Sequence, residues 1–229
     1  MIIDDIAITN SLVDIDRMKS LAEKLESVKD LIGNIIEVGV YKGGTARVLC
    51  LNTDEKVFLI DTFEGLPQEC EFDNHHKKGE FNNTSIEYVS KKVLYDLSNY
   101  EIIKQEFPKG DTSKLDNLKF KFVHLDIDLF ESMHNCLEYF YPKMVEGGYM
   151  IFDDYGMYTC LGVKKAIDDF FIGKEKIIQG ANCQFYIIKE GEEWVINFTQ
   201  LVQHVEIHLI DLVNYVFVVV IIIQMLKEI

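Results

Sequence analysis

Positive charge, proline and paired cysteines are all scarce in this sequence. Lys and Arg number 23 against 38 Asp and Glu, which leaves a net charge of −15. Such a chain is repelled by a phosphate backbone, so we expect no nucleic-acid partner. The five cysteines are scattered and form no Cys-x-x-Cys pair, which argues against a disulfide framework or a zinc site. Together with a start that lacks the basic and apolar regions of a secretory signal, this indicates a cytoplasmic protein.

The composition is that of a folded protein. Apolar residues make up 48% and charged residues 27% of the 229 residues. This length accommodates one domain with a sizeable core and a short appendage. We therefore predict one domain over residues 1–190 and a hydrophobic extension over 191–229.

Short apolar strands alternate with amphipathic helices along the chain, which predicts an α/β sandwich with a mostly parallel sheet. The polar segment 69–81 is expected to be a loop or lid whose His75 and His76 face solvent. Gly147 and Gly148 are expected to end a helix, and residues 180–182 to turn an antiparallel hairpin that closes the sheet. Helices are predicted over 11–30, 45–51, 85–97, 131–144 and 161–171, and strands over 35–40, 57–61, 101–105, 120–127, 149–153, 176–179 and 184–188.

A glycine-rich turn follows the first predicted strand, with the sequence Glu-Val-Gly-Val-Tyr-Lys-Gly-Gly-Thr over residues 37–45. It lacks the Gly-x-Gly-x-x-Gly dinucleotide pattern, because Glu37 occupies the first glycine position. An acid there repels a pyrophosphate but attracts a cation, which favours S-adenosylmethionine over NAD. Asp61, at the end of the second strand, is placed to accept hydrogen bonds from ribose hydroxyls. The alternative is an ordinary glycine connection with a helix-capping acid.

Two acidic pairs are the strongest chemical signal. Asp126 and Asp128 end one predicted strand, and Asp153 and Asp154 end the next. Side chains alternate along a strand, so Asp126 and Asp128 should point to the same side. Four carboxylates at one sheet edge repel one another unless protons or a hard cation intervene, and Mg²⁺ is the cation that suits oxygen ligands. The alternative is a set of helix N-caps.

Ordered blocks of the sequence resemble the macrocin O-methyltransferase family: residues 37–44, 61–67, 124–132, 147–148, 153–156 and 162–166. The resemblance covers about residues 10–189 and implies a class I, Rossmann-like methyltransferase fold that uses S-adenosylmethionine and Mg²⁺ to methylate sugar hydroxyls. It implies that Asp126, Asp153 and Asp154 hold the metal and that Asp128 is the general base. The cofactor-binding residues that it implies are Glu37, Gly39, Val40, Tyr41, Gly44, Thr45, Asp61, Thr62, Phe63 and Asp126.

The sequence departs from the family pattern in two places. The aromatic-containing spacer expected between Gly110 and Asp111-Thr112 is missing, which shortens the loop near the expected adenine. The residues after Lys189 match nothing in the family.

Several alternatives stay open at this stage. The acceptor is expected to be a sugar hydroxyl of a glycoside or natural product; the alternatives are a catechol-like diol, or a non-catalytic interaction protein that uses the fold as a scaffold. The apolar run 209–226 is compatible with a packed helix or strand, with a homo-oligomer interface, or with a membrane anchor that would make the cytoplasmic protein membrane-associated.

Overall fold

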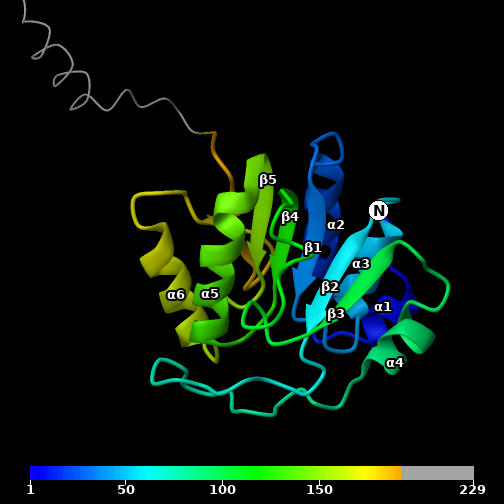
Figure 1. Ribbon diagram of the computed structural model, residues 1–229, viewed down its shortest axis with the longest axis horizontal. Helices are drawn as coiled ribbons and strands as arrows, with labels where there is room; N and C mark the ends of the chain where they lie inside the picture. The colour runs from blue at the N-terminus through cyan, green and yellow to red at the C-terminus, as the bar shows by residue number, and fades with distance from the viewer. Residues whose placement is uncertain (192–229) are drawn as a thin grey trace, which may run out of the picture. The chain divides into compact units, whose positions relative to one another are not determined.

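In residues 1–191, which the computed structural model describes, seven strands form one sheet in the order β3-β2-β1-β4-β5-β7-β6 (Figure 1). Neighbouring strands among β1 to β5 pair in parallel, whereas β7 runs antiparallel to both β5 and β6. The fold is thus the class I methyltransferase sandwich with its closing antiparallel hairpin, as predicted. The strands are β1 (Asn34–Val38), β2 (Val57–Asp61), β3 (Tyr100–Lys104), β4 (Phe120–Leu125), β5 (Met144–Phe152), β6 (Ile178–Gln179) and β7 (Phe185–Ile188).

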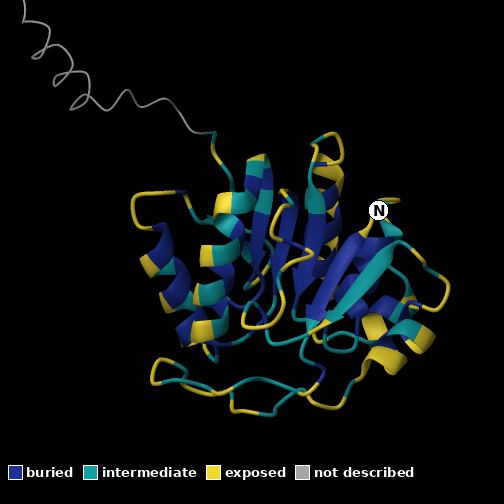
Figure 2. Ribbon diagram, in the orientation of Figure 1, coloured by how far each residue is buried: buried dark blue, intermediate teal, exposed yellow. Residues whose placement is uncertain are grey.

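Helices cover both faces of the sheet, whose central strands are buried (Figure 2). Alternate residues of β1 separate the two layers: Ile35 packs in the cluster that contains α2 and α3, and Ile36 in the one that contains α5 and α6. The helices are α1 (Asp5–Thr9), α2 (Ile15–Ser27), α3 (Gly44–Leu51), α4 (Ile86–Tyr88), the π-helix η1 (Val89–Val93), α5 (Phe130–Phe140), the 3-10 helix η2 (Tyr141–Lys143) and α6 (Leu161–Phe171).

The structure corrects the predicted helix over 131–144. It ends at Phe140, passes into a 3-10 turn that contains Pro142, and β5 already begins at Met144. Gly147 and Gly148 therefore lie within a strand instead of ending a helix. Gly147 has φ 77°, and the β4–β5 register shifts across this stretch, so the glycines accommodate an irregularity in the pairing.

Two other elements near the N-terminal half differ from prediction. The helix expected over 85–97 is a short α-turn followed by the π-helix and ends at Val93. The helix α1 was not predicted; Asp4 caps it by accepting a hydrogen bond from the backbone N–H of Ala7. With five residues, α1 is too short to show a clear hydrophobic period.

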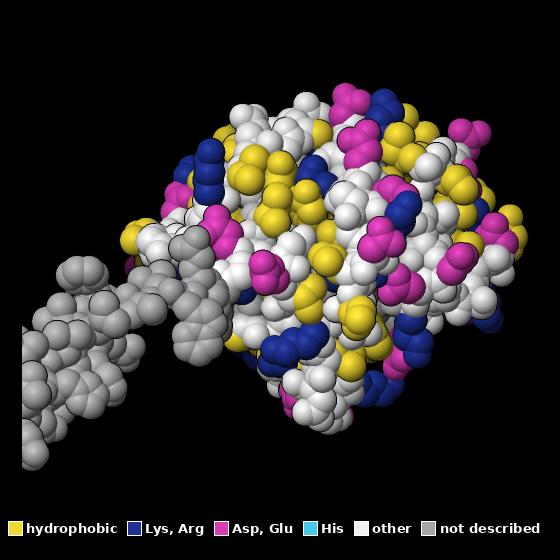
Figure 3. Space-filling view, turned by 90° about the horizontal axis from the view of Figure 1, so that it is seen from above, with side chains coloured by type: hydrophobic (Ala, Val, Ile, Leu, Met, Phe, Trp, Pro, Cys, Tyr) yellow, Lys and Arg dark blue, Asp and Glu magenta, His cyan; other side chains and the backbone are white. Residues whose placement is uncertain are grey.

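Figure 3 shows the end of the molecule at which the strands begin, where Lys and Arg side chains lie among Asp and Glu side chains. The parallel strands finish at the opposite end, where the segment 69–81 lies (Figure 1). Asp126 and Asp128 follow β4 there, and Asp153 and Asp154 follow β5.

No helix within residues 1–191 is long and apolar enough to cross a bilayer. The predicted extension from 191 onward, with the apolar run 209–226, lies outside the described residues apart from Gly191. Its packing, oligomer and membrane alternatives stay predictions.

Candidate functional site

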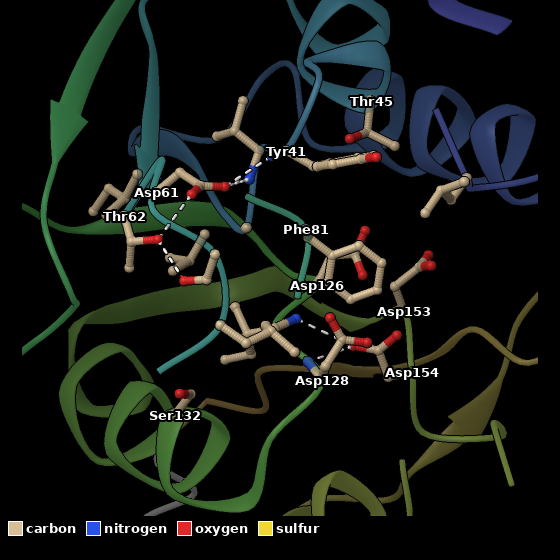
Figure 4. Close-up of a pocket in the computed structure, with 18 of the residues that line it drawn as sticks. Tyr41, Thr45, Asp61, Thr62, Phe81, Asp126, Asp128, Ser132, Asp153 and Asp154 are labelled. Carbon is tan, nitrogen blue, oxygen red and sulfur yellow. Dashed lines mark hydrogen bonds between the residues drawn. The ribbon is translucent and has the colours of Figure 1, made fainter. Parts of the chain in front are cut away.

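A cavity of about 220 Å³ opens at the carboxyl ends of the parallel strands (Figure 4). Open α/β sheets bind their ligands outside the carboxyl ends of the strands. One side of the cavity is formed by the glycine-rich turn and the end of β2, and the other by the loops after β4 and β5. Of the predicted residues, it is lined by Gly39, Val40, Tyr41, Gly44, Thr45, Asp61, Thr62, Asp126, Asp128, Asp153 and Asp154.

The glycine-rich turn is shaped by close contacts within the protein. Gly39 has φ 91°, and a Cβ added there would lie 1.7 Å from the carbonyl oxygen of Asp126. A Cβ on Gly44 would lie 2.5 Å from the carbonyl oxygen of Ala7. These glycines therefore let the turn pack tightly against the chain after β4 and against α1, and this packing places the turn at the cavity wall.

Asp61 holds the turn from the neighbouring strand. Its Oδ2 accepts hydrogen bonds from the backbone N–H groups of Val40 and Tyr41, each at 2.8 Å, and its Oδ1 accepts one from Phe63 at 2.7 Å. A carboxylate oxygen has more than one lone pair, so Asp61 retains acceptor capacity toward the cavity that it lines. Its predicted contact with a ribose stays a prediction.

Two of the predicted cofactor residues do not reach the cavity. Glu37 is fully buried in β1, and its Oε1 lies 2.9 Å from Nδ1 of His124. Phe63 is also buried and belongs to the apolar cluster that contains α3. In this structure Glu37 contacts a histidine beneath the site, and Phe63 packs in the apolar cluster behind the turn.

Asp126, Asp153 and Asp154 converge, and each offers a carboxylate oxygen within 4.8 Å of the others (Figure 4). Burial and the charges of neighbouring carboxylates hold the pKa of Asp126 well above its ordinary value. The same two causes raise the pKa of Asp154 to about 6. Three oxygen donors that repel one another at this distance form a site that a hard divalent cation would stabilise, so the residues present fit Mg²⁺.

Asp128 lies beside this cluster, but strand alternation, the predicted reason, does not place it there. Because β4 ends at Leu125, strand alternation does not orient the side chain of Asp128. The residue has φ 58°, and its N–H and that of Ile127 both donate to Oδ2 of Asp154 at 3.1 Å. Burial and the charge of Asp154 raise the pKa of Asp128 well above its ordinary value. Asp154 thus binds the loop that carries Asp128.

A buried polar network supports the cluster from below. Asp153 forms an ion pair with Arg17 of α2, and its Oδ1 accepts a hydrogen bond from Nε2 of Gln184 at 2.9 Å. Nε2 of His124 lies 3.7 Å from the same oxygen. Burial alone would lower the pKa of His124, but the carboxylates of Asp153 and Glu37 raise it to about 9. The site therefore holds a fixed positive charge on two sides of Asp153.

The sequence-based reasoning missed Arg17, and it was wrong about His76. Arg17 lies among the apolar positions of a helix with 8% of its side chain exposed, and a charge in such a position was the available signal. His76 was expected to face solvent, yet its side chain is 13% exposed. Its Nε2 lies 3.6 Å from Oδ1 of Asp128 and its Nδ1 lies 2.8 Å from Oε2 of Glu80. His75 is exposed, as predicted.

Comparison with known proteins identifies relatives that share both sequence and fold. The family described as macrocin-O-methyltransferase (TylF) matches residues 3–179. The demethyldecarbamoylnovobiocin O-methyltransferase of Streptomyces niveus is 28% identical over 70% of this chain and 67% of its own. The 8-demethyl-8-(2,3-dimethoxy-alpha-L-rhamnosyl)-tetracenomycin-C 4'-O-methyltransferase of Streptomyces olivaceus is 25% identical over 72% of this chain and 68% of its own.

A solved structure agrees with the sequence comparison. The O-methyltransferase NovP superposes with a TM-score of 0.68 at 25% identity, over 80% of this chain and 83% of that one. The family match spans the glycine-rich turn, all four aspartates and the segment 69–81. The resemblance stated from the sequence blocks is thereby confirmed: the chain belongs to the macrocin O-methyltransferase (TylF) family of S-adenosylmethionine-dependent O-methyltransferases.

Proposed function

We propose that this protein methylates a sugar hydroxyl of a glycosylated small molecule, with Mg²⁺ held by Asp126, Asp153 and Asp154 and with Asp128 as the general base. The observation that carries the proposal is the convergence of these four carboxylates in the same cavity as the glycine-rich turn. O-methylation of a weakly acidic hydroxyl requires a group that removes the proton and a cation that stabilises the oxygen, both next to the methyl donor.

The β1–β2 side of the cavity binds the cofactor. Asp61 fixes the turn and offers the remaining lone pair of Oδ1 to a hydroxyl group, while Tyr41 and Thr45 also line the cavity. S-adenosylmethionine supplies a methyl group on a positively charged sulfur. The negative potential of the aspartates favours a cation at this position, so the protein's main task here is orientation.

The β4–β5 side binds and activates the acceptor. When bound, Mg²⁺ supplies positive charge that lowers the pKa of a coordinated hydroxyl. Asp126, Asp153 and Asp154 would hold the ion, and Arg17 and Gln184 orient Asp153 for that role. Asp128 lies next to the proposed metal ligands but is grouped by distance with His76 and Cys160 instead, so it would stay outside the ligand set of Mg²⁺ and accept the hydroxyl proton.

The acceptor class is proposed from the relatives. The names of two curated relatives describe O-methylation of a novobiocin derivative and of the 4' position of a rhamnosyl tetracenomycin. The cavity lining also includes the polar or charged side chains of His76, Arg17 and Thr159. Such a surface suits a hydroxyl-rich sugar, whose oxygens need hydrogen-bonding partners once they leave water.

A panel of acceptors tests the proposal. The purified protein is incubated with S-adenosylmethionine and either Mg²⁺ or a chelator, with desmethyl glycosides and catechols as acceptors, and products are analysed by mass spectrometry. We expect a gain of one methylene on a glycoside only when Mg²⁺ is present. Methylation of catechols but not of glycosides would show that the acceptor is a catechol-like diol. Equal turnover in the presence of a chelator would show that the reaction does not need the metal.

A further inference from the structure

The lid, defined as residues 69–81, is fastened to the two helices that border the acceptor side. Oδ1 of Asp73 accepts a hydrogen bond from the backbone N–H of Phe130 at 2.8 Å, at the start of α5. Oδ1 of Asn74 accepts one from the backbone N–H of Leu161 at 3.2 Å, at the start of α6. Nδ2 of Asn74 also donates to the carbonyl oxygen of Tyr158 at 3.0 Å. Two successive lid residues thus bond to two different helices.

Neither helix has an N-cap side chain of its own. The residues at the N-cap positions are Leu129 and Cys160, and neither makes a side-chain capping bond. Ser, Thr, Asp or Asn usually occupies this position and satisfies the free N–H groups of the first turn. In this protein Asp73 and Asn74 do so from the lid. We call these two residues the latch.

The packing around the latch is close. A Cβ added to Gly162, in the first turn of α6, would lie 2.1 Å from Oδ1 of Asp73 and 3.0 Å from Cβ of Phe130. The ring of Phe72 lies 4.6 Å from that of Phe130, between centroids, with the Nζ of Lys165 5.1 Å from the centroid of Phe72. The absence of a side chain at residue 162 therefore leaves the space that the docked lid occupies.

Docking of the lid brings His76 to Asp128. The backbone of Asp128 is held by Asp154, but the carboxylate itself is contacted by weaker partners: Sγ of Cys160 and Nε2 of His76, both 3.6 Å from Oδ1. Glu80 orients the imidazole through Nδ1, which directs Nε2 toward Asp128. The ring of His76 also packs against Phe81, 5.6 Å between centroids, and both residues line the cavity.

We propose that His76 is a positioning residue for the base Asp128, and that the latch of Asp73 and Asn74 delivers it. Through its contact with Oδ1, His76 limits the rotation of the Asp128 carboxylate, while Asp154 holds the backbone of the same residue. This inference rests on the proposed role of Asp128 and assigns to the lid a part in the chemical step in addition to covering the cavity. A base that is free to rotate spends less time aligned with the hydroxyl, so its loss of alignment lowers kcat more than it raises KM.

Steady-state kinetics with the glycoside that the acceptor panel yields tests the role of His76. We expect His76→Phe to lower kcat about tenfold with the KM for S-adenosylmethionine unchanged. His76→Gln, which keeps an N–H group near the Nε2 position, should recover part of that loss. His75→Phe, at the exposed neighbour, is the matched control and should leave kcat unchanged. An unchanged kcat in His76→Phe overturns the inference, as does an equal loss in His75→Phe.

Hydrogen–deuterium exchange, which needs no acceptor, tests the latch together with kcat measurements on the same variants. Asp73→Ala with Asn74→Ala, and separately Gly162→Ala, should speed exchange across 69–81 and lower kcat as much as His76→Phe does, while S-adenosylhomocysteine still binds. His76→Phe itself should leave exchange of the lid nearly unchanged. A mobilised lid with normal kcat overturns the inference alone. No methyl transfer by the wild-type protein to any panel acceptor is the failure of the proposed function, and the role of His76 in the reaction falls with it.

Discussion

Arg17 and Asp153, 136 residues apart in the chain, form a buried ion pair beneath the candidate metal site. Asp14 holds the other edge of the guanidinium, with its Oδ2 2.7 Å from Nε of Arg17. Helix α2 thereby places a permanent cation on one of the three proposed metal ligands. That cation stabilises Asp153 as a carboxylate and at the same time competes with any metal ion for its charge.

Removing this cation should strengthen metal binding. We expect Arg17→Gln to bind Mg²⁺ about tenfold more tightly than the wild-type protein, because one repelling charge next to the ion is lost while a hydrogen-bond donor remains. Isothermal titration calorimetry with MgCl₂ measures this directly. Lys19→Gln removes an exposed charge from the same helix and should change nothing. Weaker binding in Arg17→Gln would show that orientation of Asp153 outweighs the repulsion.

Asp154 has two functions that a pair of substitutions separates. It accepts two backbone hydrogen bonds from the loop that carries Asp128, and it is a proposed metal ligand. Asp154→Asn keeps an acceptor oxygen for the loop but loses the charge, so Mg²⁺ affinity should fall by about tenfold or more with thermal stability nearly unchanged. Asp154→Ala should lose both Mg²⁺ affinity and thermal stability. Equal Mg²⁺ affinity in the wild type and Asp154→Asn would remove Asp154 from the ligand set.

Gly39 is expected to tolerate no side chain. Gly39→Ala combines a positive φ with a clash against the carbonyl oxygen of Asp126, so it should destabilise the fold by about 3 kcal/mol or more and abolish binding of S-adenosylhomocysteine. Gly173 also has a positive φ, but a Cβ there meets nothing within 4 Å. Gly173→Ala therefore controls for φ alone and should cost about 1 kcal/mol in chemical denaturation. Similar losses in both variants would contradict the role given to the close contact.

The buried His124 predicts a dependence of stability on pH. Its pKa is raised from an ordinary 6.5 to about 9. Folding therefore favours the protonated form: this stabilisation is complete below pH 6.5 and is lost as pH rises through 9, with an upper limit of about 3 kcal/mol. Denaturant unfolding of the metal-free protein at several pH values should show this decline. His124→Asn should lack it, and parallel pH profiles for the two proteins would contradict the assignment.

Much of the fold follows from local sequence patterns. The strand 57–61 and the helix 161–171 have the predicted bounds, because each is an apolar or amphipathic run of ordinary length with clear ends. Gly147 and Gly148 were read as a helix stop because glycine is common there. Their place inside β5 depends on the irregular pairing with β4, which connects distant parts of the chain.

The four aspartates were found from their positions at strand ends, whereas their supports were not. Arg17, Gln184 and His124 contact Asp153 from α2, the β6–β7 turn and β4, and no local pattern links them. Glu37 was assigned to the cofactor because its position in the turn is visible in sequence, but its partner His124 on the adjacent strand is not. The lid residue His76 was misjudged for the same reason: its burial arises from docking onto α5 and α6.

Crystals of the S-adenosylhomocysteine complex soaked in Mn²⁺ test the central claim most directly, because anomalous scattering locates the ion. We predict one Mn²⁺ ligated by Asp126, Asp153 and Asp154, with Asp128 outside its ligand shell and the sulfur of the cofactor product facing the same space. The claim that these three carboxylates form the metal site would be contradicted if the ion is bound elsewhere, or if no ion is bound between them at saturating Mn²⁺.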